Sequence, residues 1–395
     1  MKKFTGAGIA LLLGTTAAYA GGMDRSGQSI TALFEEGTYA EISFGSVSPD
    51  VSGVYTLAPL PSGNIAPDYT TFGLAFKTDV NDKVSLAFIM DQPFGANVDY
   101  STAGYPLAGT SAEVTSSSIT LLGQYQINDN ASVYAGPRIV SVEGQYRAAK
   151  LGVEAYSAGY EKSSEMGYVV GAAYEIPEIA LRAAVTYSSE MSFALNGSGY
   201  GAAEVPNPTF DSNLPESPTN PRTVAVPFGT AVGNLTATTP QTVNLDFQTG
   251  VAANTLAIAS IRWADWSEAT IDDSVAGNLT DFGNKDTYTY TIGLGRKFSD
   301  NFSGLISVGY EKAAGDYTGN LSPTDGYTSL SLGGAYTFDN GMELSGGIRR
   351  VWVGDATSYS PVSTTTPAPG NLTTPFGNFS DNSVTAIGLK LAYNY

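Results

Sequence analysis

The side chains that most often carry out chemistry in proteins are scarce in this sequence. Its 395 residues include no histidine and no cysteine. This composition removes Ser-His-Asp triads, histidine bases, the usual zinc sites and disulfides. No pair of a nucleophile and a base can be nominated from the remaining residues. We therefore predict no catalytic residues, no cofactor and no metal site, and we expect that the protein is not an enzyme.

Acidic side chains are the largest ionisable group, with 37 Asp and Glu against 19 Lys and Arg. Nucleic acid binding requires a basic face, so we exclude nucleic acid as a partner. Several carboxylates fall in predicted loops: Asp265, Glu268, Asp272, Asp273 and Asp281. We interpret them as solubilising groups, with divalent cation binding as the less favoured alternative.

Three basic residues have a specific chemical use, because Arg138, Arg182 and Lys297 would suit a ligand that carries a carboxylate. Arginine in particular makes bidentate contacts with such a group. This use requires that they point into an enclosed space. The favoured alternative is that enclosed cations form ion pairs with acidic residues such as Glu190, Glu311 and Glu343.

Residues 1–20 carry the pattern of an export signal. Lys2 and Lys3 precede a short apolar run, and Ala18-Tyr19-Ala20 has the small-x-small form of a cleavage site. The mature chain is expected to begin near Gly21. It has no apolar run of about eighteen residues, so we predict no transmembrane helix. An exported chain of this kind is periplasmic, secreted or a β-barrel.

Segments of alternating apolar and polar residues recur after residue 37, and each is about long enough to cross a membrane as a tilted strand. They predict fourteen strands: 38–48, 70–79, 83–91, 112–126, 130–145, 163–175, 179–193, 241–250, 254–268, 285–299, 301–311, 326–338, 341–353 and 381–395.

Short and long connections alternate strictly between these strands. The long ones span 49–69, 92–111, 146–162, 194–240, 269–284, 312–325 and 354–380. Outer-membrane barrels have short periplasmic turns, long outer loops and an even strand count. The sequence therefore predicts an all-β transmembrane antiparallel barrel over residues 38–395, located in the outer membrane, with both termini periplasmic.

The direction in which side chains point follows from the alternation. In the last strand the apolar row is Ile387, Leu389, Leu391, Tyr393 and Tyr395. This row should face lipid, and Lys390 the lumen. The same parity places Arg182, Lys297 and Arg349 inside, with Arg138 and Arg262 if Ile139 and Trp263 face lipid. The small and polar inner rows indicate a lumen and not a packed core.

Two segments outside the strands contain apolar residues. The loop 194–240 holds Phe210, Leu214, Val226 and Phe228, which suggest a landing surface for a hydrophobic ligand. Self-packing over the barrel mouth is the alternative. Residues 21–37 precede the first strand and include Met23, Ile30, Leu33 and Phe34. Their apolar character favours a plug folded into the lumen over a free tail.

The chain resembles the outer-membrane long-chain fatty-acid transporter family (FadL type), which includes aromatic-hydrocarbon uptake proteins. The most specific match is W-x-D-W-S at Trp263-Ala264-Asp265-Trp266-Ser267. Weaker matches are Pro93-Phe94-Gly95, the segment 326–339 entered from S-P-x-D, and the aromatic C-terminus. The family's Asn-Pro-Ala motif is not found, and Ser29-Ile30-Thr31-Ala32 stands near its place.

The resemblance implies a fourteen-stranded barrel, an N-terminal plug (hatch) and a kinked third strand beside it. It also implies lateral release of ligand toward the membrane, with Pro93, Phe94 and Gly95 at the gate. Glycine tolerates the strained backbone of a kink. A simple turn that opens an outer loop is the alternative for this segment.

These patterns together predict passive, ligand-gated uptake of long-chain fatty acids or other hydrophobic molecules. A general diffusion porin for small polar solutes is the alternative within transport, and a barrel enzyme such as a lipase is the alternative in another class. The expected partners are the hydrophobic ligand, outer-membrane lipid and lipopolysaccharide, and the barrel assembly machinery. We expect a monomer.

Overall fold

The computed structural model describes residues 23–150, 153–206, 223–227, 233–279, 286–315, 318–359 and 375–395. The predicted signal peptide lies outside these residues. No helix in the described part of the chain is long and apolar enough to span a membrane.

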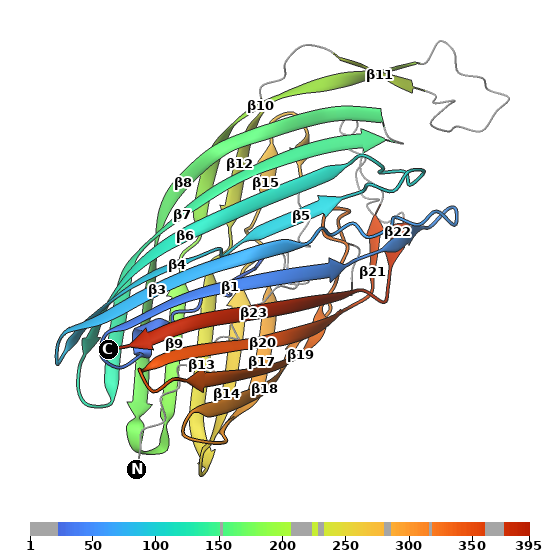
Figure 1. Ribbon diagram of the computed structural model, residues 1–395. Coiled ribbons are helices and arrows are strands. Elements are labelled where there is room, and N and C mark those ends of the chain that lie inside the picture. The colour runs from blue at the N-terminus through green and yellow to red at the C-terminus, as the bar shows by residue number, and fades with distance from the viewer. Residues whose placement is uncertain are drawn as a thin grey trace.

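Strands form the wall of a closed barrel (Figure 1), and in the described part of the chain their antiparallel pairings close into a ring of fourteen. Around the ring these are β1 (Tyr39–Asp50), β3 (Tyr69–Asn81), β4 (Val84–Asp91) with β5 (Gly95–Asp99), β6 (Ser111–Gln126), β7 (Ala131–Lys150), β8 (Val153–Ile176), β9 (Leu181–Ser188) with β10 (Met191–Pro206), β13 (Thr242–Ala252) with β12 (Asn234–Thr239), β14 (Thr255–Ala264), β17 (Thr287–Lys297), β18 (Phe302–Glu311), β19 (Tyr327–Thr337), β20 (Met342–Val353) and β23 (Ser383–Asn394).

The last strand closes the ring, because β23 pairs with both β20 and β1. Each of the fourteen predicted segments overlaps one of these strands, so the predicted barrel is confirmed. The main difference lies at the loop end. Residues 146–162, predicted as a loop, mostly belong to β7 and β8, and the predicted loop 194–240 contains the end of β10, β11 (Thr223–Pro227) and β12.

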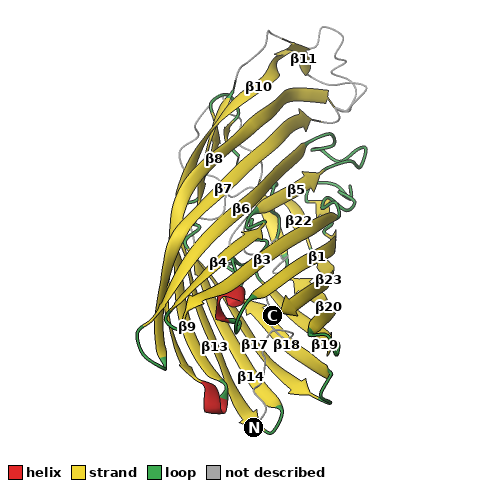
Figure 2. Ribbon diagram, turned by 60° about the vertical axis from the view of Figure 1, so that its left-hand side comes forward, coloured by secondary structure: helices red, strands yellow, loops and turns green. Residues whose placement is uncertain are grey.

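Smaller elements fill the loop end and the lumen. At the loop end, β15 (Ile271–Asp273) and β16 (Gly277–Asn278) extend the sheet formed by β10 and β12, and β2 (Gly53–Tyr55), β21 (Ala356–Tyr359) and β22 (Pro375–Phe379) form a second sheet. The short helix η4 (Thr31–Phe34) lies within the ring of strands (Figure 2), and η5 (Pro177–Ile179) forms one of the short turns.

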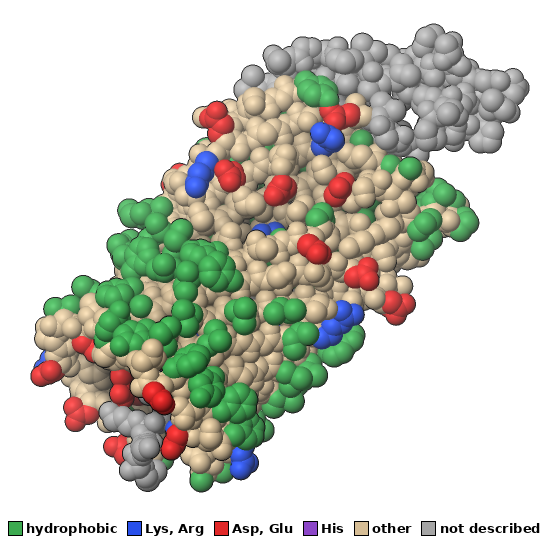
Figure 3. All heavy atoms as spheres, viewed as in Figure 1, with side chains coloured by type: hydrophobic (Ala, Val, Ile, Leu, Met, Phe, Trp, Pro, Cys, Tyr) green, Lys and Arg blue, Asp and Glu red, His purple; other side chains and the backbone are tan. Residues whose placement is uncertain are grey.

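The predicted facing of the last strand is confirmed. Ile387 and Leu389 are exposed on the outer face, whereas Lys390 is buried inside. Outward apolar side chains gather over the half of the barrel that ends in the short turns, and beyond them the surface carries scattered charged groups (Figure 3). This apolar belt is the surface that a membrane would cover.

Candidate functional site

The N-terminal segment pairs with the interior of the barrel wall as if it were an extra strand. The amide of Arg25 donates to the carbonyl of Pro93 at 2.8 Å, and the amide of Gly95 donates to the carbonyl of Met23 at 2.8 Å. Asp24 and Phe94 form an antiparallel bridge between these two bonds. Pro93 and Gly95, both predicted at the gate, are therefore hydrogen-bonded directly to the segment predicted as the plug.

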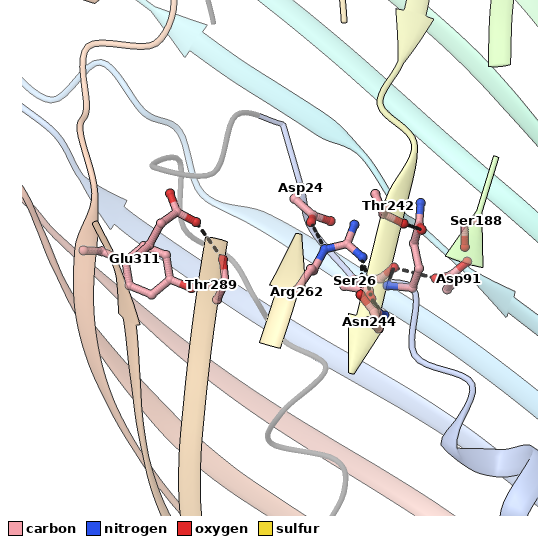
Figure 4. A network of polar contacts seen from close by, with 12 residues as sticks. Asp24, Ser26, Asp91, Ser188, Thr242, Asn244, Arg262, Thr289 and Glu311 are labelled. Carbon is pink, nitrogen blue, oxygen red and sulfur yellow. Dashed lines mark hydrogen bonds and ion pairs between the residues drawn. The ribbon is translucent and has the colours of Figure 1, made fainter. Parts of the chain in front are cut away.

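Polar side chains attach the same segment to other strands (Figure 4). Arg262 on β14 forms an ion pair with Asp24 and donates to Asn244 Oδ1 at 2.8 Å. Its guanidinium also donates to the carbonyl of Gly27 at 3.2 Å. On the other side, Ser26 donates to Asp91 of β4 at 2.5 Å. The segment thus crosses the lumen between β14 and β4 and is bonded at both ends.

The helix η4 fills the lumen between this crossing and the short turns. Ile30 and Leu33 are buried among inward side chains of the wall, several of which are alanines: Ala75, Ala87, Ile89, Leu122, Tyr134, Val169, Ala173 and Ala184. These small residues leave room for the helix. Phe34 packs edge-on against Tyr134, with the ring centroids 5.7 Å apart.

The three predicted ligand cations do not form one site. Arg182 stacks over the ring of Phe34, 4.6 Å from its centroid, and donates to Gln248 at 3.2 Å. Arg138 is buried and donates to Thr120 at 2.8 Å and to Ser188 at 3.2 Å. Lys297 lies 3.5 Å from Asp300 in the adjacent turn. Arg182 and Arg138 thus lie at different places along the lumen.

Lumenal ion pairing is present, and the close pairs in the described part of the chain include acidic residues that were not predicted from sequence. Lys390 pairs with Glu41 at 3.2 Å, and Arg262 pairs with Asp24. Of the predicted acidic partners, Glu311 accepts a hydrogen bond from Thr289 at 2.7 Å (Figure 4). Each of these pairs joins segments that are far apart in the sequence. Sequence spacing therefore does not reveal which residue pairs with a buried charge.

The third strand is interrupted at Gln92-Pro93-Phe94, between β4 and β5. Asp91 pairs with Ser118 and Gly95 with Thr115, so three residues lie opposite two and form a β-bulge. Phe94 turns inward, and its amide donates to Ser116 Oγ at 2.9 Å. The Ser116 hydroxyl donates in turn to the Phe94 carbonyl at 2.6 Å.

The other edge of this kink has no ladder partner. β3 pairs with β4 only as far as Leu74 and Met90, while β3 itself continues to Tyr69. The amide of Phe72 is bonded instead by the side chain of Gln92, at 3.0 Å. A pocket of about 130 Å³ lies here, and its lining includes inward residues and outward ones: Arg25, Ala32 and Lys390 inside, Phe44 and Phe72 outside.

Two apolar clusters meet above this crossing. Trp266 of the W-x-D-W-S motif is buried and packs edge-on against Phe94, with the ring centroids 6.3 Å apart. The outer apolar cluster lies toward the loop end: Val140, Val142, Tyr156, Ala158, Tyr160, Met191, Phe193, Leu195, Leu235, Ala237 and Ile271. Met23 packs against both groups. Apolar side chains therefore continue from the loop end to the kink.

Two of the predicted loop carboxylates are not solvated groups. Asp273 is buried and accepts hydrogen bonds from the hydroxyls of Tyr156, at 2.8 Å, and Tyr160, at 2.5 Å. Burial raises the pKa of Asp273, but hydrogen bonds from Tyr160 and from the amides of Ala276 and Val275 outweigh it and lower the pKa below its usual value. Asp265 is also buried and accepts from Gln241 at 3.0 Å. Of the others, Asp281 lies outside the described residues.

The predicted landing loop is described only in part. Phe210, Leu214 and Phe228 lie outside the described residues. Val226 belongs to β11 and is in register with Ala203 of β10. The predicted capture role of this loop stays a prediction.

Residues 20–395 match the model of the family described as outer membrane protein transport protein (OMPP1/FadL/TodX). The chain belongs to this family. It is therefore an outer-membrane transport protein, and its family is one of transport proteins and not of enzymes. A search of curated protein sequences found no match.

Solved structures agree on the fold. A FadL homologue of Pseudomonas aeruginosa superimposes with a TM-score of 0.72 at 14% identity, covering 99% of this chain and 98% of that one. The toluene transporter TodX of P. putida gives 0.63 at 12% identity, with 91% and 90% covered. The toluene transporter TbuX of Ralstonia pickettii gives 0.58 at 11% identity, with 92% and 91% covered.

Proposed function

We propose that this protein takes up long-chain fatty acids or similar hydrophobic molecules by passive, ligand-gated diffusion, and that the ligand leaves sideways through the kink. The observation that carries this proposal is the pocket at the kink, where the wall has lost its ladder and inward and outward residues line one space. A ligand that leaves there enters the membrane and does not have to enter water.

The apolar side chains above the kink support the same route. A hydrophobic ligand would pass from the outer apolar cluster along Met23 to Phe94 and Trp266. The N-terminal segment, residues 21–37, would act as the plug, because its described part crosses the lumen and is bonded to the kink. Displacement of this segment by ligand would open the pocket.

Several further expectations join this proposal. The C-terminus lies with Thr38 at the end of the barrel that carries the short turns, since the amide of Tyr395 donates to the Thr38 carbonyl at 2.8 Å. We place this end in the periplasm. The protein would act as a monomer, surrounded by outer-membrane lipid and lipopolysaccharide after insertion by the barrel assembly machinery.

The ligand class is tested by direct uptake. Solved relatives of similar fold include toluene transporters, so a small aromatic hydrocarbon is the alternative ligand. Cells that lack their own transporters would be supplied with radiolabelled oleate or toluene. Uptake of oleate supports the proposal. Uptake of toluene alone moves the ligand class to aromatic hydrocarbons, and conduction of small ions by the purified protein would support a general porin.

Lateral release is tested by closing the kink with a disulfide. The sequence contains no cysteine, so no native thiol can compete for the introduced pair. Phe72→Cys with Gln92→Cys ties β3 to the kinked segment, where the Gln92 side chain already reaches the Phe72 amide. The matched control is Phe76→Cys with Phe88→Cys, a ladder pair on the same two strands. Oxidation should abolish oleate uptake in the first variant only, and reduction should restore it. Normal uptake by the oxidised kink variant would mean that the ligand passes down the lumen.

A further inference from the structure

The barrel wall is also interrupted between β8 and the strand formed by β9 and β10. Residues 169–176 of β8 pair with 188–181, and residues 156–160 pair with 201–197. The stretches between them, 161–168 and 189–196, form no ladder pairs with each other. Each stretch is roughly 25 Å long at the usual strand rise. We call this interruption the β8–β10 seam.

The lower end of the seam is closed by one residue. The amide of Ser189 donates to the Tyr168 carbonyl at 3.0 Å, and the amide of Tyr168 donates to Ser189 Oγ at 3.0 Å. Above these bonds, β10 uses its opposite edge to pair with β12, from Met191 with Thr239 to Asn196 with Asn234. The facing edges of β8 and β10 are therefore the unpaired ones.

A change of phase on each strand explains why the ladder stops. On β8 the ladder to β7 passes from Val142 with Ser163 to Gly144 with Tyr160, so one extra residue is inserted near Glu161. Below this point the buried positions on β8 are odd-numbered, and above it they are even-numbered. These positions are Val169 and Ala173 below, and Tyr156, Ala158 and Tyr160 above.

β9 and β10 show the same change at the opposite end of the seam. Buried positions are even-numbered in β9 and odd-numbered in β10: Ala184, Thr186 and Ser188, then Met191, Phe193 and Leu195. The register above and below the seam is the same. Within the seam, that register would place an inward residue opposite an outward one. Antiparallel partners must face the same side, so no ladder forms.

The outer apolar cluster lies directly behind the seam. Met191, Phe193 and Leu195 of β10 pack with Val140 and Val142 of β7 on the inner side of the wall. On the β8 side, Gly167 carries no side chain, and a Cβ added there would lie 3.0 Å from Met191 Cγ and Sδ. Met191 therefore lies behind the lower part of the seam, with Phe193 and Leu195 further along it. The unbranched chain of a methionine changes rotamer easily.

The seam spans the upper edge of the apolar belt. On the outer face of β7 and β8, the pair Ile139 and Met166 is exposed, with Met166 at 71%. The next outward pair is Ser141 and Ser164. An amphipathic molecule in the outer leaflet would hold its alkyl chain at the level of Met166 and its polar end above, which places the chain against the seam.

We propose that the β8–β10 seam is a lateral entry portal, through which the alkyl chain of an amphipathic molecule passes from the outer leaflet into the outer apolar cluster. This inference rests on the proposed uptake function and adds an entry route from the membrane to it. Ligand would enter through one interruption of the wall and leave through the other. Rotation of Met191, which lies against Gly167 of β8, would accompany the entry step.

The test closes the seam with a disulfide between Ser164→Cys and Ser192→Cys, two outward positions on its facing edges. The matched control is Ser141→Cys with Ser164→Cys, because these serines form a ladder pair with their hydroxyls 2.7 Å apart. Oleate delivered from outer-leaflet vesicles is the probe. Oxidation of the seam variant should slow its uptake several-fold and reduction should restore it, while the control variant is unchanged.

Hydrogen exchange of the purified barrel tests the seam without any substitution. Amides of residues 161–167 and 190–196 that face the seam should exchange faster than those of 169–176 in the same strand. Equal protection of these amides from exchange would show that the two strands are hydrogen-bonded along the seam, and it would overturn the proposal. Full oleate uptake by the cross-linked seam variant would overturn it too and leave the uptake function standing. No oleate uptake by the unmodified chain would instead overturn the function itself.

Discussion

The kink and the β8–β10 seam both lack a stretch of β-ladder, but different contacts close them. At the kink, Gln92 bonds the Phe72 amide and Ser116 bonds both backbone groups of Phe94. The N-terminal segment forms hydrogen bonds with the carbonyl of Pro93 and the amide of Gly95. At the seam, polar contacts are found at Ser189, and apolar side chains of β10 lie behind it, with Met191 against Gly167.

This difference predicts different barriers to opening. Opening the kink exposes buried polar groups unless ligand or water replaces their partners, and each such group costs free energy. Opening the seam moves apolar side chains of β10 and breaks fewer polar contacts. We therefore interpret the kink as a gate that polar contacts hold closed and the seam as an entrance with a lower barrier to opening. Substitutions at the kink should have large effects, and those at the seam small ones.

The largest effect is expected for Asp24→Ala, which removes the ion pair that holds the N-terminal segment on β14. Arg262 would remain buried, and in the described part of the chain its guanidinium would keep the hydrogen bonds to Asn244 and to the Gly27 carbonyl but no carboxylate partner at ion-pair distance. We expect the free energy of local opening at the kink to fall by about 3 kcal/mol. The Gly95 amide, which is bonded to Met23, should then exchange about a hundredfold faster.

The double variant Asp24→Ala with Arg262→Ala provides the control, because it removes the stranded charge as well. It should be less destabilised than Asp24→Ala alone. Exchange at the seam should not change in either variant. An unaltered Gly95 exchange rate in Asp24→Ala would show that the ion pair does not hold the gate.

A smaller effect is expected for Ser116→Ala, which leaves the amide and the carbonyl of Phe94 without their side-chain partner. We expect a loss of about 2 kcal/mol in local stability at the kink. Ser117→Ala, on the opposite face of the same strand, and Ser164→Ala, at the seam, should each cost less than about 0.5 kcal/mol. Thermal unfolding and exchange of residues 91–96 measure the difference. Equal effects of Ser116→Ala and Ser117→Ala would show that the hydrogen bonds of Ser116 do not hold the kink closed.

The sequence predicts the part of the wall that lipid constrains. Where one face must be apolar, alternation is strong, and all fourteen strands and the facing of Lys390 follow from it. The kink at Pro93 and Gly95 is what the family resemblance implies, and these residue types suit it because they disturb a ladder through their own backbones. Above the belt the apolar side chains, such as Tyr156, Tyr160 and Leu195, point inward, so the extensions of β7, β8 and β10 lack the lipid-facing row on which the prediction relied.

Contacts between distant segments are the part that sequence does not predict. Arg182 stacks on Phe34 and Arg262 pairs with Asp24, and in both cases the barrel's closure decides the partner. Trp266 is recognised as part of a motif, but its contact with Phe94 is not. The seam is hidden for a related reason. The changes of phase near Glu161 and Ser189 lie among polar residues, where alternation cannot be read.

The smallest effect concerns Asp273, whose hydrogen bonds from Tyr156 and Tyr160 tie β15 to β8. Because β15 pairs with β12 and β12 with β10, these bonds connect β8 to β10 through the sheet at the loop end. Tyr156→Phe removes one of four donors to this carboxylate. We expect it to cost about 1 kcal/mol in local stability of residues 271–276.

The lowered pKa of Asp273 makes the stability of this contact depend on pH. Since the folded pKa lies below the unfolded value, the contact contributes full stability at neutral pH and loses it as the pH falls through the folded pKa. Exchange of the amides of Val275 and Ala276, measured with the intrinsic pH effect removed, should rise only at acidic pH. Asp273→Asn should abolish that dependence and loosen the loop at all pH values. If the variant and the unmodified chain respond to pH alike, a group other than Asp273 holds β15 on β8.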